Sequence, residues 1–376
     1  MSVDDFLNIT DKIELAFKEL LQCGLWSREP QPDYFCNLSK NDWFHLLKLA
    51  DEQAVAGLCY PALVKLPVYC RPSIELLLQW YGRAGYTEQC NRHLRKVWDE
   101  LNERFRRANI KVILLKGIGV ANWYDRPLLR APGDLDLYFP SDYDSAIETV
   151  RKWGIEVEYG DWHHTFYYKG VEVELHAAYN HLASQGIDIE TSVVENDVGK
   201  YLIPAPAFNA QLLLIHPAFH LLKEGISLRY LCDWSMFLRA NAYFIDFDIL
   251  QKELRKSGTG DFGLVFTALA VAYLGLNTQG IPPRWTAGKF GRRLRQLYQD
   301  MITTGNFGRT NILHQQPFAT LTLSDKLIRV KKEVSRAVSL SPYCRKQATS
   351  FVCHKLGRVC KAAITGKEFR WEKRKR

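Results

Sequence analysis

The sequence predicts an α+β fold, in which a small mixed β-sheet core is flanked by helical segments on its N- and C-terminal sides. Two observations predict this fold. Short β-rich or period-two runs gather between residues 109 and 204, and helical periodicity dominates before and after them. The chain of 376 residues is long enough for such a core with helical additions. We expect a helical N-terminal segment (1–108), an α/β core (109–204), a helical domain (205–320) and a basic C-terminal tail (321–376).

The first hundred residues have the pattern of helices. Ser39 is a candidate N-cap with Asp42 three residues later, and an apolar face follows them. A longer helical pattern extends over residues 72–108. Gly82 and Gly85 are the places where this long helix is most easily interrupted.

The central unit has the pattern of strands. Residues 111–115 form a short β-rich run, and residues 134–139 alternate with a period of two. A capped helix is expected at 141–153. Further on, Lys169-Gly170 separates two strand-like runs, the second of which is 171–176. We expect 111–115, 134–139 and 171–176 to be neighbours in one mixed sheet.

Helical patterns resume after residue 205. They cover residues 208–225, 227–240, 246–257, 261–276 and 287–304, and residues 324–340 form a basic amphipathic helix candidate.

The positive charge is concentrated at the C-terminal end. The chain has a net charge of +9, but residues 321–376 hold 16 Lys/Arg and 4 Asp/Glu, a balance of +12. The rest of the chain is therefore at −3. Two interpretations remain open: a solvated end, or a patch that binds anionic lipid, nucleic acid or an acidic partner. Phe369 and Trp371 are the aromatic residues near this end that stacking on bases would use.

Cysteine usage and hydropathy predict a cytoplasmic protein. The nine cysteines are an odd number without a CxxC pair, so we expect reduced thiols. The start of the chain lacks the pattern of a secretory signal. The longest apolar run, residues 262–276, is shorter than the roughly 20 residues that a membrane span needs. We expect no transmembrane segment.

Acidic residues alternate along two of the expected strands. In "LLKGIGVANWYDRPLLRAPGDLDLYF" (114–139), Asp134 and Asp136 share one strand face. Glu172 and Glu174 share a face of the later strand. Converging carboxylates repel one another unless a divalent cation lies between them, so we expect a metal, not an arginine, as their partner. Two Mg²⁺ ions about 3.5–4 Å apart promote phosphoryl or nucleotidyl transfer.

These motifs resemble those of a known family. The 114–139 stretch, then "VEVELHAAY" and then "HLLKEGISLRYLCDW" are similar to the uncharacterised bacterial nucleotidyltransferases, within the polymerase-β-like superfamily. The likeness covers roughly residues 40 to 310. It implies a nucleotidyltransferase core, a bound Mg²⁺ or Mn²⁺, and an NTP substrate, with ATP as the expected one. Members often lie beside surface-polysaccharide genes.

The resemblance assigns roles to individual residues. It places Asp134 and Asp136 in the metal-binding pair and makes Glu174 the third acid, so that these three are the expected catalytic residues. Lys116 and Gly117 match the turn that faces the triphosphate. The superfamily has Gly or Ser after this glycine and a shorter gap to the acids, whereas Ile118 follows here and Asp134 lies 17 positions after Gly117.

Further residues match the family's loop and helical signature. Tyr124 and Arg130 match the loop before the two aspartates, and Arg229 and Asp233 match the helical motif. With His176, the residues Tyr124, Arg130 and Arg229 are the expected substrate-binding residues besides the Lys-Gly turn. Arg229 and Asp233 are also spaced i,i+4, so a simple ion pair is the alternative.

Several histidines and one glutamate leave alternatives open. Glu172 is an alternative third acid. His176 either tunes the acid or contacts substrate, or is a structural histidine. His216 and His220, in "HPAFH", have the i,i+4 spacing of a helical zinc site but lack its glutamate, so lining the nucleotide cleft is the alternative. His163-His164 have no metal-site spacing and are expected in a loop or at a strand edge.

The leading functional hypothesis is a Mg²⁺-dependent nucleotidyltransferase. It transfers NMP from an NTP to the hydroxyl or phosphate of an unidentified acceptor, with surface polysaccharide biosynthesis as the expected setting. The alternative is a catalytically silent binding or assembly protein that retains the nucleotidyltransferase fold. A third hypothesis is nucleic-acid binding through the basic tail.

Overall fold

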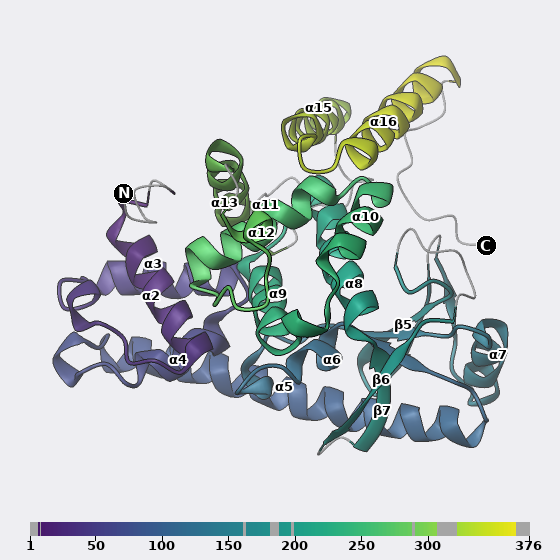
Figure 1. The fold of residues 1–376 in the computed structure, drawn as a ribbon, viewed down its shortest axis with the longest axis horizontal. Coiled ribbons are helices and arrows are strands. Elements are labelled where there is room, and N and C mark those ends of the chain that lie inside the picture. Colours follow the sequence, from purple (N-terminus) through teal and green to yellow (C-terminus); the bar gives the residue numbers. More distant parts are fainter. Residues whose placement is uncertain are drawn as a thin grey trace.

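The protein is a seven-stranded mixed sheet with helices around it, which confirms the expected α+β class (Figure 1). The computed structural model describes residue 7 and residues 9–160, 163–180, 188–196, 199–287, 290–306 and 322–365. The strand order is β3-β4-β5-β2-β1-β7-β6. The strands are β1 (Ile113–Leu115), β2 (Leu135–Tyr138), β3 (Glu158–Tyr159), β4 (His164–Tyr168), β5 (Val171–His176), β6 (Thr191–Asn196) and β7 (Gly199–Pro204).

The middle of the sheet is formed by the three strands that the sequence predicted as neighbours. β2 lies between β1, to which it is antiparallel, and β5, to which it is parallel. The register pairs Asp136 with Leu115 on one side and with Glu174 on the other. β4 and β5 form a hairpin around the predicted turn at Lys169-Gly170. This confirms the predicted neighbours and the hairpin.

β3, β6 and β7 were not predicted. β7 is parallel to β1, and β6 pairs only with β7, at the edge of the sheet. An edge strand can expose apolar residues to solvent, as Val193 does with 56% of its surface exposed. Its sequence then lacks the alternation of buried and exposed residues that identifies a half-buried strand.

Helices precede and follow the sheet. Before it come α2 (Lys12–Trp26), η1 (Pro32–Tyr34), α3 (Lys40–Glu52), α4 (Ala56–Leu63), η2 (Val68–Cys70) and α5 (Ile74–Arg107). Within the sheet region lie α6 (Gly117–Ala121), η3 (Pro127–Leu129) and α7 (Tyr143–Lys152). After it come α8 (Pro206–Lys223), α9 (Leu228–Asn241), η4 (Ala242–Phe244), α10 (Phe247–Ser257), α11 (Gly260–Leu274), α12 (Pro283–Thr286), α13 (Gly291–Thr304), α15 (Leu323–Leu340) and α16 (Arg345–Thr365).

The predicted helix signals have their expected structural effect at the start of α3. Ser39 accepts a hydrogen bond from the Asp42 amide, and the Asp42 carboxylate accepts one from the Ser39 amide, which completes a capping box. In contrast, Gly82 and Gly85 do not interrupt α5, which continues for 34 residues. A Cβ at either glycine would meet no atom within 4 Å, so both lie on an open face of the helix.

α5 connects the two large apolar cores of the protein. At about 1.5 Å per residue it is about 51 Å long. Leu76 and Trp80, near its start, belong to the core of the helical part. Trp98 and Phe105, near its end, pack with the sheet and α7. Figure 1 shows α5 running under the N-terminal helices and on to the strands. α5 therefore contributes buried side chains to both cores.

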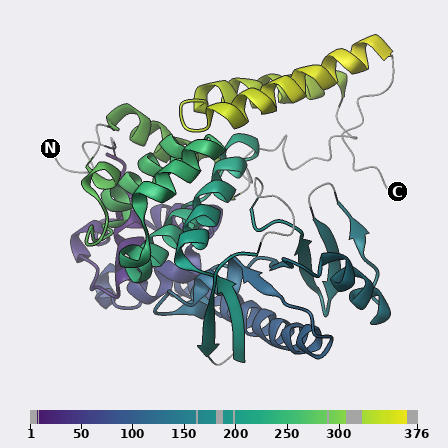
Figure 2. The same cartoon turned by 45° about the vertical axis from the view of Figure 1, so that its right-hand side comes forward.

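Residues 322–365 form two helices that pack on the rest of the protein, above the helical region in Figure 2. The Arg336 guanidinium donates to both carboxylate oxygens of Asp300 on α13, at 2.6 Å each, and to the carbonyl of Leu221 on α8. Lys355 on α16 donates to Glu333 on α15 at 2.5 Å. This part of the expected tail is thus folded, and residues 366–376, with Phe369 and Trp371, lie outside the described residues.

The expectation that every thiol is reduced is wrong for two cysteines. Cys36 and Cys70 form a disulfide, with their Cα atoms 4.3 Å apart. They lie 34 residues apart in sequence, next to η1 and at the end of η2, so no local motif announces the pair. Among the cysteines whose side chains the structure describes, the free ones are Cys23, Cys59, Cys90, Cys232, Cys344 and Cys353. Among the described residues, no helix is long and apolar enough to cross a membrane.

Candidate active site

The turn between β1 and α6 has an unusual backbone. Lys116 has a φ of +49° and Gly117 a φ of +43°, in a region that L side chains rarely adopt. A Cβ on Gly117 would lie 3.3 Å from the carbonyl oxygen of Asp134. Glycine therefore suits a position with a left-handed backbone and a close neighbouring chain. The turn brings Lys116 and Gly117 directly beside the start of the acidic strand.

Three carboxylates converge on neighbouring strands. Asp134, Asp136 and Glu174 each offer an oxygen, and these oxygens lie within 4.8 Å of one another. The parallel pairing of β2 and β5 sets Asp136 beside Glu174, and Asp134 lies two residues earlier on the same face. Asp136 is only 2% exposed, whereas Asp134 is exposed to solvent. The oxygen donors of this acid group (Asp134, Asp136 and Glu174) suit a hard divalent cation.

Glu172 lies apart from the acid group. It is exposed and sits opposite Tyr167 on β4, two residues before Glu174. Of the two glutamates left open by the sequence, the structure brings Glu174 to the aspartates.

A lysine, not only a metal, is available as a partner for these acids. Lys116 Nζ lies 2.8 Å from Asp136 Oδ1, an ion pair that was not predicted from the sequence. Burial alone raises the pKa of the Asp136 carboxyl, but the charge of Lys116 and the hydrogen bond from His176 outweigh it and hold the pKa below its usual value. The negative charge of Asp136 raises the pKa of Asp134 to about 6, and partial desolvation of this carboxyl by the protein around it adds to the rise, although the residue as a whole is exposed. Negative charge thus remains in excess beside Asp134, where a cation would relieve it.

His176 connects two of the acids. Its Nε2 lies 3.0 Å from Asp136 Oδ1 and 3.2 Å from Glu174 Oε2. Burial lowers the pKa of His176, but its hydrogen bonds to Asp136 and Glu174 outweigh this, and the net pKa is raised. In this arrangement His176 fixes the positions of both carboxylates.

His163 also contacts the acid group, a role that was not predicted from the sequence. Its Nε2 lies 3.0 Å from Glu174 Oε1. The hairpin register gives the reason: His164 pairs with Leu175, so the next position places His163 opposite His176. The predicted turn at Lys169-Gly170 contained this signal, because a two-residue turn fixes the register of the whole hairpin.

Arg130 and Tyr124 contact a different partner from the one expected. Arg130 Nε and Nη2 donate to the two oxygens of Asp233 at 2.7 and 2.8 Å, and its Nη1 donates to the Ala131 carbonyl. The Tyr124 hydroxyl donates to Asp233 Oδ1 at 2.7 Å. All three side chains are buried. The guanidinium expected to face a phosphate is instead part of a buried ion pair between the loop and α9.

Arg229 does not form the i,i+4 ion pair with Asp233, because Asp233 is held by Arg130. Its guanidinium lies over the Tyr230 ring, 5.1 Å from the centroid, and Nη1 is 3.4 Å from the Ala131 carbonyl. The residue is 8% exposed, and its Nε has no hydrogen-bond partner among the described atoms. Arg229 therefore lies against the loop that leads into Asp134.

His216 and His220 are neighbours on α8, with ring centroids 4.5 Å apart, and both contact Tyr230. Pro217 lies within this helix, which continues past it. Neither histidine belongs to a group of three or more His, Cys, Asp or Glu ligands among the described residues. The zinc alternative therefore has no third ligand of these kinds in the described part of the chain.

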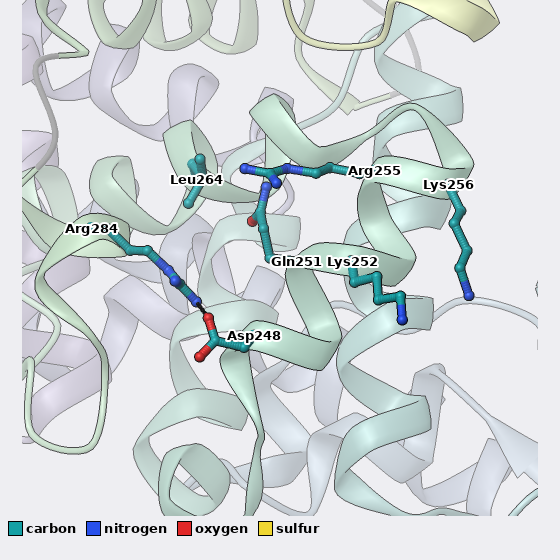
Figure 3. Close-up of a pocket in the computed structure, with 7 residues that line it drawn as sticks. All are labelled: Asp248, Gln251, Lys252, Arg255, Lys256, Leu264 and Arg284. Carbon is teal, nitrogen blue, oxygen red and sulfur yellow. Dashed lines mark hydrogen bonds and ion pairs between the residues drawn. The ribbon is translucent and has the colours of Figure 1, made fainter.

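A surface hollow lies elsewhere, on the helices after the sheet. Its volume is about 470 Å³, and it is lined by Asp248, Gln251, Lys252, Arg255, Lys256, Leu264 and Arg284 (Figure 3). Arg284 is paired with Asp248, as the dashed line shows. None of the expected site residues lines this hollow, so it is not part of the acid group's surroundings.

Comparison with known proteins identifies the same family as the sequence motifs. The model of a family described as uncharacterised nucleotidyltransferase matches residues 39–275, which include the acid group, the Lys116-Gly117 turn and α9. No curated protein and no protein of solved structure matches the chain. Because the matched region is more than half of the 376 residues, the chain belongs to this family of uncharacterised nucleotidyltransferases.

Proposed function

We propose that this protein transfers a nucleoside monophosphate from an NTP to an acceptor hydroxyl or phosphate and releases pyrophosphate. The observation that supports this best is the convergence of Asp134, Asp136 and Glu174 beside the Lys116-Gly117 turn, in a chain of the nucleotidyltransferase family. All three side chains offer only carboxylate oxygens, the donor set that Mg²⁺ and Mn²⁺ prefer.

The acid group would hold Mg²⁺ or Mn²⁺, which neutralises charge on the phosphates and lowers the barrier to nucleophilic attack. His163 and His176 hold Glu174 in position from two sides. Gly117 has no side chain to obstruct a phosphate approaching the turn. Lys116 pairs with Asp136 in the protein alone, and we propose that it turns to the triphosphate when a cation replaces it there.

Arg229 is the second cation that we assign to substrate. It is nearly buried beside the loop that leads to Asp134, and part of its guanidinium is unused. Arg130 and Tyr124, in contrast, hold Asp233 and so position the loop. We propose ATP as the NTP and a surface-polysaccharide precursor as the acceptor. An NTP substrate implies action in the cytoplasm.

The direct test is incubation with each labelled NTP, Mg²⁺ or Mn²⁺, and cell extract. A labelled acceptor that forms with the metal ion, but not when EDTA is present from the start, supports transfer. Binding of Mg-NTP without any labelled product, with every NTP and extract tried, would instead support the catalytically silent binding protein that retains the fold.

Lys116→Met should change metal and nucleotide binding in opposite directions. Without the competing ammonium, Mg²⁺ alone should bind the acids more tightly. Mg-NTP should bind about 10- to 100-fold more weakly, because a charge-assisted hydrogen bond of about 1.5–3 kcal/mol is lost. Calorimetric titrations with Mg²⁺ and with Mg-NTP measure both. Lys111→Met, which removes an exposed lysine paired with Asp188, is the matched control and should change neither. A parallel loss of both affinities would contradict the proposed double role.

The basic end is proposed to bind an anionic partner. Residues 357–376 contain eight Lys/Arg and two Asp/Glu. Deleting them removes the end of α16 (residues 357–365) but should leave the rest of the fold intact, because the Arg336–Asp300 and Lys355–Glu333 contacts remain. Binding to anionic vesicles or to nucleic acid should weaken, and the difference should fade with salt, since screening limits electrostatic reach to about 8 Å at physiological ionic strength. Sedimentation with vesicles and gel shift measure the two arms; unchanged binding in both would show that the end is merely solvated.

A further inference from the structure

A second group of metal-ligand side chains lies beside the acid group. His163 precedes β4, and Glu174 and His176 lie on β5. One ligand atom from each lies within 4.8 Å of the others. The ring centroids of the two histidines are 5.3 Å apart. The exposed fraction of the side chain is 27% for His163, 16% for Glu174 and 14% for His176. The group is thus partly open to solvent, so that an ion can enter and water can complete its coordination.

The two nitrogen–oxygen distances in this group are slightly shorter than the distance between ligands of one small ion. Ligands about 2.0–2.1 Å from a tetrahedral ion lie about 3.3–3.4 Å from one another. His163 Nε2 is 3.0 Å from Glu174 Oε1, and His176 Nε2 is 3.2 Å from Glu174 Oε2. Small movements of the three side chains would therefore let them share one ion in place of the present hydrogen bonds.

The chemistry of the donors differs from that of the acid group. Asp134, Asp136 and Glu174 offer oxygen only, whereas two of the three donors here are imidazole nitrogens. Nitrogen donors favour Zn²⁺, Co²⁺ and related first-row ions, and Mg²⁺ prefers oxygen. Each Nε2 now contacts a carboxylate oxygen; with the ring proton on Nδ1, the same Nε2 lone pair is available to a metal.

We propose that His163, Glu174 and His176 bind a divalent transition-metal ion, at a site distinct from that of the Mg²⁺ ions and sharing Glu174 with it. The shared carboxylate links the two sites thermodynamically, so an ion at one changes the affinity of the other. The site does not depend on whether the protein transfers nucleotides, because its ligands and its geometry are independent of the NTP.

The test uses Co²⁺ as a spectroscopic probe with the full-length protein. Visible absorption and calorimetry should show one tight Co²⁺ site with nitrogen ligands. His163→Ala should weaken Co²⁺ binding at least about 10-fold and reduce the visible bands. His163→Gln, which retains a polar side chain of similar reach, should do the same if the loss concerns the ligand and not the fold.

Two control variants separate this site from its surroundings. His45→Ala removes an exposed histidine on α3 and should leave the Co²⁺ titration unchanged. Asp134→Asn removes a carboxylate of the acid group alone and should retain the Co²⁺ bands while it weakens Mg-NTP binding. If both His163 variants bind Co²⁺ as the wild type does, or if Asp134→Asn abolishes the bands, the ion lies among the aspartates and the proposed site is wrong.

Discussion

Asp134→Asn and Asp136→Asn should each abolish detectable nucleotidyl transfer and weaken Mg²⁺-dependent NTP binding more than about 100-fold. Loss of a residue outside the coordination shell commonly costs about 10- to 100-fold, so loss of a ligand should cost more. Each variant keeps the shape of the side chain and removes one negative charge. Calorimetric titration of NTP with and without Mg²⁺ measures the effect on binding.

The two variants should differ in stability without metal. Asp136 is buried and paired with Lys116 and His176, so Asp136→Asn should lower the free energy of unfolding by about 1.5–3 kcal/mol. Asp134 is exposed and repelled by Asp136, so Asp134→Asn should not lower it. Urea unfolding in EDTA tests the difference.

Glu172→Gln is the matched control for both aspartate variants. It removes a carboxylate from β5, on the strand face that carries Glu174, but from an exposed position outside the acid group. It should leave both metal-dependent binding and stability unchanged. Mg-NTP binding equal to that of the wild type in Asp134→Asn and Asp136→Asn would show that the acid group holds no catalytic metal, and the proposed function would fall.

Asp233→Ala should destabilise the protein by about 3–5 kcal/mol, because it leaves the buried Arg130 guanidinium without its charged partner. The same change removes the acceptor of the Tyr124 hydroxyl. Urea unfolding at neutral pH measures the loss. Since the pair joins the loop before Asp134 to α9, Mg-NTP affinity should also fall, through misplacement of the acid group.

Asp125→Ala provides the comparison for Asp233. Asp125 also pairs with an arginine, Arg239, at 2.8 Å, but both side chains are substantially exposed. Surface pairs contribute about 0–1 kcal/mol, so the control should be close to wild type. If both substitutions lowered the free energy of unfolding equally, burial would not account for the stability that the Arg130–Asp233 pair contributes.

The centre of the sheet could be predicted because its sequence signals involve residues that are close together in the chain. Alternation on 134–139 and 171–176 fixes which side chains share a face, and the Lys169-Gly170 turn fixes the hairpin. These features suffice to place Asp136 and Glu174 on one surface. β6 escaped prediction because an edge strand with exposed apolar residues lacks the alternation on which such inference depends.

The partners of the charged residues could not be predicted, because they depend on distant parts of the chain. Arg130 and Asp233 lie 103 residues apart, and nothing near Arg130 in sequence separates a phosphate-binding arginine from a buried one. The Lys116–Asp136 pair depends on the left-handed backbone at Lys116, which the sequence does not specify. The Cys36–Cys70 bond likewise requires a fold that brings their backbones together.

α5 has a consequence for how the protein loses its structure. Trp80 and Phe105 lie on one continuous helix but belong to different apolar cores. Unfolding of either half of α5 would therefore expose one of these cores to solvent and leave the other half of the helix with a frayed end. The N-terminal helices and the acidic strands are therefore linked by the packing of α5 as well as by the chain. A cut at residue 108, between the first two parts predicted from the sequence pattern, would divide the sheet from α5, which packs against it. The nucleotidyltransferase region is therefore best regarded as a cooperative unit that includes the helices before it.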